Sequence, residues 1–253
     1  MQACQLTKKR IPLLDLLKWV ALITMVIDHA VYLAPGTLDV LHVPGRISFP
    51  LFALVMAMHV FRQLPGEIHR PENWTWLKKL ALYGCIAQPV FMMYVGSPTA
   101  DIMFTLAIGL GLALAYHHRS TFAPAMVCIL LLSLFSIHWS HLISYGICGV
   151  LLPVAFVYAL ERRTVETWLA PACLAFAMNI PTPVLNDLIV DPVATYQDGN
   201  QLMVVWASVA ALTCLVGLAV CKQTISFRVP AVTGWAYMFY PAHLVFLAMV
   251  ALI

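Results

Sequence analysis

Apolar residues in this chain form long runs, separated by short segments that hold most of the charged residues. A helix that crosses a bilayer needs roughly 20 predominantly apolar residues, because the hydrocarbon core is about 30 Å thick. The runs therefore predict about nine transmembrane helices, with eight to ten as the range. The predicted spans are 12–34, 46–61, 77–95, 102–116, 122–138, 142–160, 168–180, 201–220 and 231–253. The run 168–180 is short, so a tilted, re-entrant or extended segment is left open there.

The composition agrees with a chain that lies in a membrane over its whole length. Hydrophobic residues make up 62% of the sequence and charged residues 10%, and the mean hydropathy is +0.88. Soluble domains carry roughly 25% charged residues, which excludes that class. We interpret residues 1–253 as a single all-α domain, a polytopic transmembrane helix bundle. The net charge of +3 is spread over the loops and does not favour nucleic-acid binding.

The basic residues indicate the orientation of the predicted helices. Nearly every Lys and Arg falls on the side of the N-terminus, and Arg46 is the exception on the opposite side. The loops 96–101 and 181–200 on that opposite side carry Asp but no Lys or Arg. Because Lys and Arg are retained on the cytoplasmic side of a membrane, we predict a cytoplasmic N-terminus and an outer C-terminus.

Asp28 and His29 lie side by side inside the first predicted span. A charged residue at membrane depth costs roughly 2.5–3.5 kcal/mol on insertion scales, so such residues indicate a functional site. Neighbouring residues on a helix point about 100° apart, so Asp28 is not expected to orient His29. Arg46 opens the second span from the same side and is the expected partner of Asp28. The pair is either part of a site or a structural ion pair between two helices.

Two histidines are candidate bases within the membrane. His29 has an unperturbed pKa of about 6.5, which suits proton transfer near neutral pH. His243 lies near the middle of the last predicted span, close to Tyr240 and Pro241. The proline is expected to kink that helix and to free a backbone carbonyl. For either histidine the alternative is a structural role, such as a hydrogen bond between helices.

Lys18 lies on the same face of the first span as His29, eleven residues earlier. The separation is close to three turns, or roughly 16 Å along the helix axis. A cationic group at one end and an imidazole at the other would suit a long ligand that carries phosphate. The alternative is a lysine that pairs with Asp15, three residues earlier, and reaches the membrane interface.

The other polar residues of the predicted spans have separate expected positions and form no further motif. His59 is expected near the cytoplasmic interface, and Gln88 marks a polar break that is expected to line a cavity. The histidines at span ends have no metal-ligand spacing, so no metal site is predicted. The sequence contains no phosphate-binding loop, hydrolase nucleophile motif or zinc-protease motif. Any chemistry is therefore expected from the ionisable residues inside the membrane.

Six segments, taken in order, resemble the TraX family. They are LLKWVALITMVIDH (16–29), PGRISFPLFALVMA (44–57), LKKLALYGCIAQPVF (77–91), DIMFTLAIGLGLA (101–113), ISYGICGVLL (143–152) and YMFYPAHL (237–244). The resemblance covers nearly the whole chain. A more distant likeness is to integral-membrane acyltransferases of sugars and lipids, which carry an Arg, ten residues and a His in the first helix. Here Lys18 takes the place of that Arg, and a lysine contacts phosphate as a point charge instead of a bidentate fork.

The TraX family is associated with conjugative plasmids and is named for N-terminal acetylation of F-type pilin. The resemblance implies a multi-pass protein of the bacterial inner membrane, in contact with membrane lipids. It also implies an N-acetyltransferase that uses acetyl-CoA, with the N-terminal amine of a pilin subunit as acceptor. After signal cleavage that amine lies at the outer face, whereas acetyl-CoA is cytoplasmic. Donor and acceptor are therefore expected to approach from opposite sides.

On this hypothesis the ionisable residues have separate roles. The implied catalytic residues are His29, His243, Asp28 and Tyr240, and the implied donor-binding residues are Lys18 and Arg46. One of the two histidines removes the proton of the amine or carries the acetyl group. Asp28 and Arg46 set the local field and position the acceptor. Tyr240 is expected to donate a hydrogen bond to the thioester oxygen as negative charge develops there.

Other functions are compatible with the same residues. A proton-coupled transporter or flippase would use Asp28, His29 and His243 as a proton relay. An O-acyltransferase would act on a cell-surface sugar, and a non-catalytic assembly protein would need no reaction at all. The sequence shows no obvious two-half repeat, which argues against many transporter folds.

The predicted topology is testable with reporter fusions. Fusions after Arg70, Arg163 and Lys222 are expected to report the cytoplasm, and fusions near Asp101 and Asp198 the outer side. The physical reason is the retention of Lys and Arg on the cytoplasmic side. An outer-side signal after Arg70 or Lys222 would contradict the orientation.

Overall fold

The computed structural model describes residues 10–96, 98–120, 143–195 and 200–252. Helices form the regular structure of these residues, apart from one isolated bridge between Ala100 and Ile143. In chain order the elements are α2 (Pro12–Ala30), η1 (Val31–Leu33), η2 (Asp39–Leu41), α3 (His42–Gly45), α4 (Ser48–Phe61), α5 (Pro71–Val95), α6 (Ile102–His117), α8 (Gly146–Arg162), η3 (Glu166–Trp168), α9 (Leu169–Ala177), α10 (Thr182–Val190), α11 (Pro192–Thr195), α12 (Gln201–Val220) and α13 (Trp235–Val250).

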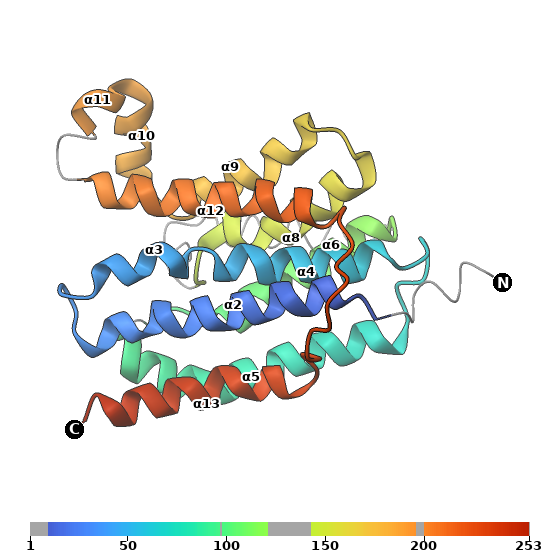
Figure 1. Ribbon diagram of the computed structural model, residues 1–253, viewed down its shortest axis with the longest axis horizontal. Coiled ribbons are helices and arrows are strands. Elements are labelled where there is room, and N and C mark those ends of the chain that lie inside the picture. The colour runs from blue at the N-terminus through green and yellow to red at the C-terminus, as the bar shows by residue number, and fades with distance from the viewer. Residues whose placement is uncertain (1–9, 97, 121–142, 196–199, 253) are drawn as a thin grey trace.

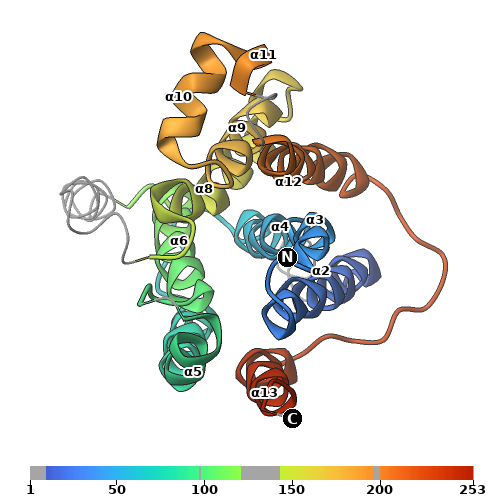
Figure 2. The ribbon, with the colours of Figure 1, turned by 90° about the vertical axis from the view of Figure 1, so that its left-hand side faces the viewer.

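The long helices lie side by side with roughly parallel axes, as in a bundle that crosses a membrane (Figure 1). Helix α2 begins at one end of the bundle and α13 ends at the other (Figure 1). Viewed end-on, α2 and α4 lie in the middle, α5 and α6 on one side, and α8, α9 and α12 on another (Figure 2). Helix α13 packs against α5 and also contacts α2. The last helix of the chain therefore lies next to the first.

Helix α4 forms the centre of the bundle. Its sequence SFPLFALVMAMHVF is apolar on every face, a pattern typical of a helix that is surrounded by protein. It packs against α2, α6, α8 and α12, and its side chains Ala53, Leu54, Ala57 and Val60 are fully buried. Helices in lipid associate through close packing and not through a hydrophobic drive, since lipid is as apolar as the side chains. Close packing around α4 therefore holds the walls of the bundle together.

Several predicted spans agree with the observed helices. Helices α2 with η1, α6 and α12 match the predicted spans 12–34, 102–116 and 201–220 to within one residue. Helix α5 begins at Pro71 instead of residue 77, because Pro71 occupies a first-turn position that suits proline. Where the span 142–160 was predicted, the structure has α8, which runs from Gly146 to Arg162. The predicted span 122–138 lies outside the described residues.

Two boundary predictions were wrong. The last span was predicted from residue 231, but residues 223–234 lie outside regular helix and α13 begins at Trp235. The range 181–200 was predicted as a loop, yet it contains the short helices α10 and α11. Prolines near their first turns favour helix starts at these places. Both helices lie beside the first turns of α12, outside the bundle (Figure 1).

Within the part of the chain that the structure describes, three helical segments are long and apolar enough to cross a membrane, namely Pro12–Leu33, Asp39–Phe61 and Gln201–Val220. Helices α6 and α13 are shorter apolar helices. Helix α9 has nine residues, or about 14 Å at 1.5 Å per residue, which is less than the hydrocarbon core. The all-helical architecture with membrane-type helices is confirmed. The number of nine spans and the orientation stay predictions.

Basic residues gather at one end of the bundle. They lie where α2 and α5 begin and where α4, α8 and α12 end, and these helix ends share one side of Figure 1. We call this the basic end, defined by Arg10, Arg62, Arg70, Arg163 and Lys222. The opposite end, which holds Arg46, Asp101 and Asn179, is called the far end. By the positive-inside rule the basic end would face the cytoplasm.

An extended segment, residues 221–234, places α13. It leaves α12 at the basic end and crosses the outside of the bundle before α13 begins (Figure 2). The first turns of α2 hold it: Val232 N donates to Asp15 Oδ1 at 3.2 Å, and Trp19 Nε1 donates to Pro230 O at 3.1 Å. These bonds fix the point at which α13 starts. They therefore set which residues of α13 face α2.

Gly45 allows α3 to approach α2 at Asp28. A Cβ atom at position 45 would overlap the Asp28 carboxylate. The close approach brings His42 of α3 to Asp28, with 2.8 Å between Nδ1 and Oδ1. A carboxylate only accepts hydrogen bonds, so His42 Nδ1 is the donor. Arg46 Nη2 lies 3.7 Å from the same oxygen, so a single glycine makes room for the whole ion-pair cluster.

The Gly45→Ala substitution is expected to destabilise the protein by displacing the Asp28 carboxylate from its partners. Loss of one partner from a buried ion pair costs about 3–5 kcal/mol. The measurement is the thermal midpoint of the purified protein in detergent, together with its abundance in membranes. The matched control is Gly111→Ala on α6, where a Cβ meets no atom within 4 Å. Equal stability of the two variants would contradict the close-approach argument.

Candidate functional site

The structure brings His29 of α2 and His243 of α13 into direct contact. His29 Nδ1 lies 2.6 Å from His243 Nε2, and the two rings are stacked with centroids 4.9 Å apart. The sequence predicted both as candidate bases, and the fold makes them one pair. The residues are separated by 214 positions in the chain, so no local pattern could show the contact.

The hydrogen bonds of the pair define its tautomers. His243 Nδ1 lies 3.0 Å from Phe239 O, and a carbonyl only accepts, so Nδ1 carries the proton. In the neutral ring Nε2 is then an acceptor, and His29 Nδ1 donates to it. The remaining nitrogen, His29 Nε2, then holds a lone pair. His29 is therefore arranged as the proton acceptor of the pair and His243 as the residue that orients it.

Tyr240 lies beside the histidine pair on α13. Its ring centroid is 6.1 Å from that of His29 and 5.6 Å from that of His243. The side chain is buried, and its hydroxyl has no hydrogen-bond partner within the described part of the chain. A buried hydroxyl without a partner is costly, so this one is available for a ligand or a reacting group.

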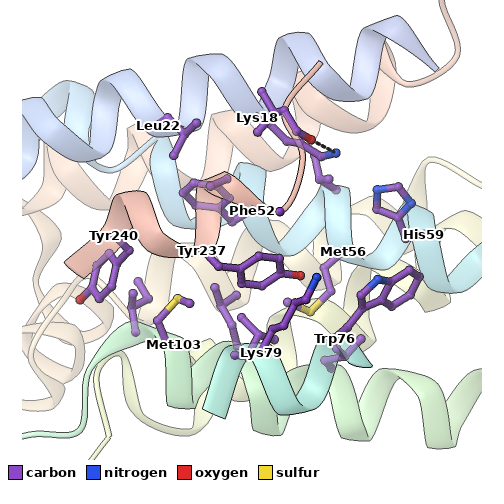
Figure 3. Close-up of a pocket in the computed structure, with 18 of the residues that line it drawn as sticks. Lys18, Leu22, Phe52, Met56, His59, Trp76, Lys79, Met103, Tyr237 and Tyr240 are labelled. Atoms are coloured by element: carbon purple, nitrogen blue, oxygen red, sulfur yellow. Dashed lines mark hydrogen bonds between the residues drawn. The ribbon is translucent and has the colours of Figure 1, made fainter. Parts of the chain in front are cut away.

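A cavity of about 370 Å³ lies between α2, α4, α5, α6 and α13. His59 and Trp76 lie at one end and Tyr240 at the other, with Lys18, Lys79 and Tyr237 between them (Figure 3). The rest of the wall is largely apolar, from residues such as Leu22, Phe52, Met56, Met103 and Leu106. Because α4 ends and α5 begins at the basic end, the cavity extends from that end toward the histidine pair.

The cationic residues of the cavity are held by identifiable partners. Lys18 Nζ lies 3.4 Å from Asp15 Oδ1 and 3.3 Å from Val232 O. The predicted ion pair with Asp15 is therefore present, and Lys18 also lines the cavity. Lys79 Nζ lies 5.6 Å above the Tyr237 ring, a cation–π distance. Lys79 was not singled out from the sequence, because one lysine of a Lys-Lys pair carries no pattern of its own.

The predicted Asp28–Arg46 ion pair is present, but it belongs to a larger cluster at the far end. His42 is closer to Asp28 than Arg46 is. Arg46 Nη1 lies 3.2 Å from Tyr145 Oη and 3.3 Å from Asn179 Oδ1. The cluster joins α2, α3, α8 and the end of α9. It satisfies charges that would be expensive to bury alone.

The structure does not bring together Lys18 and Arg46, which were predicted as donor-binding residues. Lys18 lines the cavity, whereas Arg46 stands in the far-end cluster and is not among the cavity-lining residues. Gln88, which was expected to line a cavity, does not line this one. Its side chain instead binds the segment before α6, through Thr99 O and Asp101 N at 2.8 Å each.

Several residues of the site were not predicted from the sequence. His42 lies four positions before Arg46, a spacing that places both on one helix face and that would have been a signal. Tyr145 and Asn179 come from distant segments and gave no local signal. The same holds for Trp206, whose ring centroid lies 5.2 Å from the Arg46 guanidinium carbon. Within the described residues, no three His, Cys, Asp or Glu side chains gather in a metal-binding arrangement. Among the described histidines, His117 and His118 instead bind Glu161 and Gln63.

The chain is similar to known proteins over most of its length. The chain is 33% identical to a TraX protein of Escherichia coli over 152 residues, which are 58% of this chain and 56% of that protein. It is 28% identical to the TraX protein of Escherichia coli strain K12 over 177 residues, which are 66% of each. The matches thus span between about half and two thirds of those relatives. No solved structure matches the chain. The model of the TraX protein family matches residues 13–251, and the chain therefore belongs to the TraX family.

Proposed function

We propose that this protein is a membrane-embedded N-acetyltransferase that moves the acetyl group of acetyl-CoA to the N-terminal amine of a conjugative pilin subunit. One observation carries the proposal: a cavity extends from the basic end to Tyr240, whose ring centroid lies 6.1 Å from that of His29, while His29 and His243 themselves stand behind the cavity wall. Its volume of about 370 Å³ falls within the roughly 300–1,000 Å³ of small-molecule sites. The location of this protein in the inner membrane is part of the same proposal.

The cavity suits the donor. Its apolar wall would accept the flexible pantetheine arm, with the thioester at the Tyr240 end. Lys18 and Lys79 lie between the two ends and can attract phosphate oxygens, which bind ammonium groups strongly. The adenine nucleotide would remain outside at the basic end, where cytoplasmic acetyl-CoA is available. This assignment keeps Lys18 as a donor-binding residue and adds Lys79.

The histidine pair suits the proton transfer that the reaction needs. The ammonium form of the acceptor first releases one proton to water. The neutral amine nitrogen then forms a bond to the thioester carbonyl carbon, and the carbon–sulfur bond breaks. CoA leaves as a thiolate. His29 Nε2 takes the proton that the amine loses, and this proton then passes to the thiolate, so that the products are an amide and CoA thiol. General base catalysis of this kind contributes typically 10²–10⁴-fold to a rate.

Tyr240 suits the stabilisation of the developing oxyanion. Its hydroxyl is buried beside the pair and has no partner within the described residues. A donor that is fixed before the reaction needs no reorganisation when negative charge appears on the thioester oxygen. Asp28, with His42 and Arg46, lies next to His29 in the chain and would set the field at the far end. We assign this cluster to the side from which the acceptor enters.

A proton-coupled transporter is the second candidate, favoured by the direct contact of two histidines inside the bundle. Such a pair can pass a proton along its hydrogen bond. An O-acyltransferase for a surface sugar would use the same cavity with a hydroxyl acceptor. Substrate accumulation in sealed vesicles separates the transporter from both enzymes. Mass spectrometry of pilin and of surface sugars separates the two acceptors.

The variants His29→Ala and His243→Ala are expected to lower acetyl transfer by about 10²–10⁴-fold, the usual contribution of a general base. The assay uses purified protein, labelled acetyl-CoA and a synthetic peptide with the mature pilin N-terminus. Membrane abundance should stay near that of the parent protein. The matched control is His69→Ala, since His69 is exposed at the basic end. Full transfer by the double histidine variant would end the general-base assignment.

The variants Lys18→Ala and Lys79→Ala are expected to raise the KM for acetyl-CoA by about tenfold, equivalent to about 1.4 kcal/mol. The maximal rate should change less, as expected for a ground-state phosphate contact. Initial rates at varied acetyl-CoA concentration supply the measurement. The control is Lys78→Ala, because Lys78 is the exposed neighbour of Lys79 and does not line the cavity. A larger effect at Lys78 than at Lys79 would argue against donor binding in this cavity.

A further inference from the structure

Asp101 is a buried carboxylate that the proposed mechanism does not use. Its residue is fully buried, with 0% exposure, at the start of α6. One oxygen, Oδ1, accepts a hydrogen bond from Met103 N at 2.8 Å and caps the helix. The other oxygen, Oδ2, has no hydrogen-bond partner among the described residues. Burial raises the pKa of this carboxyl group to about 7. A helix cap needs only one oxygen, so the cap does not explain the second one.

The carboxylate is held in place from neighbouring elements. Gln88 of α5 accepts from Asp101 N and donates to Thr99 O. On the other side Ser144 donates to Ala100 O from both its backbone N and its hydroxyl, at 3.1 and 2.8 Å. These bonds tie the segment before α6 to α5 and to the start of α8. The position of Asp101 is therefore set by the fold, as a binding group requires.

Tyr240 lies at the deep end of the cavity, next to the segment that begins at Asp101. Ile102 and Met103, which directly follow Asp101, line the cavity together with Tyr240. The Tyr240 hydroxyl points away from His59 and Trp76, toward the far end (Figure 3). The Tyr240 hydroxyl, like Asp101 Oδ2, has no hydrogen-bond partner in the described structure. Two buried oxygens with unused hydrogen-bonding capacity thus come from elements that border the deep end of the cavity.

We propose that Asp101 and Tyr240 bind the primary ammonium group of the acceptor before transfer. An ammonium group supplies only donors, and an ionised carboxylate supplies only acceptors, while a phenol hydroxyl both accepts and donates. The ammonium therefore satisfies Asp101 Oδ2 and the hydroxyl lone pair, and leaves the Tyr240 proton for the thioester oxygen. A neutral sugar hydroxyl carries no charge to balance the carboxylate. This inference rests on the proposed function and gives a reason for an amine acceptor.

The test measures the binding of two peptides to the full chain in detergent micelles without acetyl-CoA. One peptide carries the mature pilin N-terminus with a free amine, and the other is the same peptide with hydrogen in place of that amine. The parent protein is expected to bind the amine peptide about tenfold more tightly. The Asp101→Asn variant should lose this preference, since Asn still caps a helix but cannot be ionised. Tyr240→Phe keeps the ring and should reduce the preference.

Asp187→Asn is the control, because Asp187 is an exposed acidic residue of α10. It should keep the amine preference, and acetyl-CoA binding should be equal in the parent protein, Asp101→Asn and Asp187→Asn. Equal binding of the two peptides to the parent protein, or a full preference in Asp101→Asn and Tyr240→Phe, would overturn the inference. Acetyl transfer alongside such a result leaves the proposed function intact. An amine preference that Asp101→Asn abolishes supports the inference even where no transfer is detected.

Discussion

The contact between His29 and His243 is the interaction on which the site depends. It joins the first helix to the last across 214 positions, and it exists because α13 starts at a fixed point beside α2. That point is set where Asp15 and Trp19 bind the extended segment 221–234. The same packing of α13 against α2 and α5 closes the cavity, since α13 supplies one wall of it. The contact between the two histidines and the closure of the cavity therefore both depend on the packing of α13 against α2 and α5.

The cost of burying charge explains how the polar residues are distributed. Lys18 has Asp15, Asp28 has His42 and Arg46, and Arg46 also has Tyr145 and Asn179. Charges inside a bundle persist when they are paired and hydrogen-bonded. Among the described residues, five buried side-chain atoms have no hydrogen-bond partner: Arg46 Nε, Asp101 Oδ2, His118 Nδ1, Trp206 Nε1 and Tyr240 Oη. Of these residues, only Tyr240 lines the cavity, and Asp101 directly precedes two lining residues, Ile102 and Met103.

Membership of the TraX family and the geometry of the site support different parts of the proposed function. The family match places the chain among proteins that carry the TraX name. The geometry supplies a cavity with cationic residues, an imidazole whose free nitrogen is an acceptor, and a buried hydroxyl. These are the parts that an acyl transfer from a thioester to an amine requires. The proposed acetyltransferase joins the two without a metal or a covalent cofactor in its steps.

The sequence alone determined the helices and the candidates on them. Runs of apolar residues gave the extents of α2, α6 and α12, and the cost of charge in a membrane singled out Asp28, His29 and His243. The i, i+3 spacing gave the pair Asp15–Lys18. Only the tertiary structure decided which candidates meet, because contacts between helices depend on packing and not on local period. In the tertiary structure His29 contacts His243, whereas Lys18 and Arg46 lie in different parts of the bundle. Asp101, which the sequence placed in a loop, is a buried carboxylate.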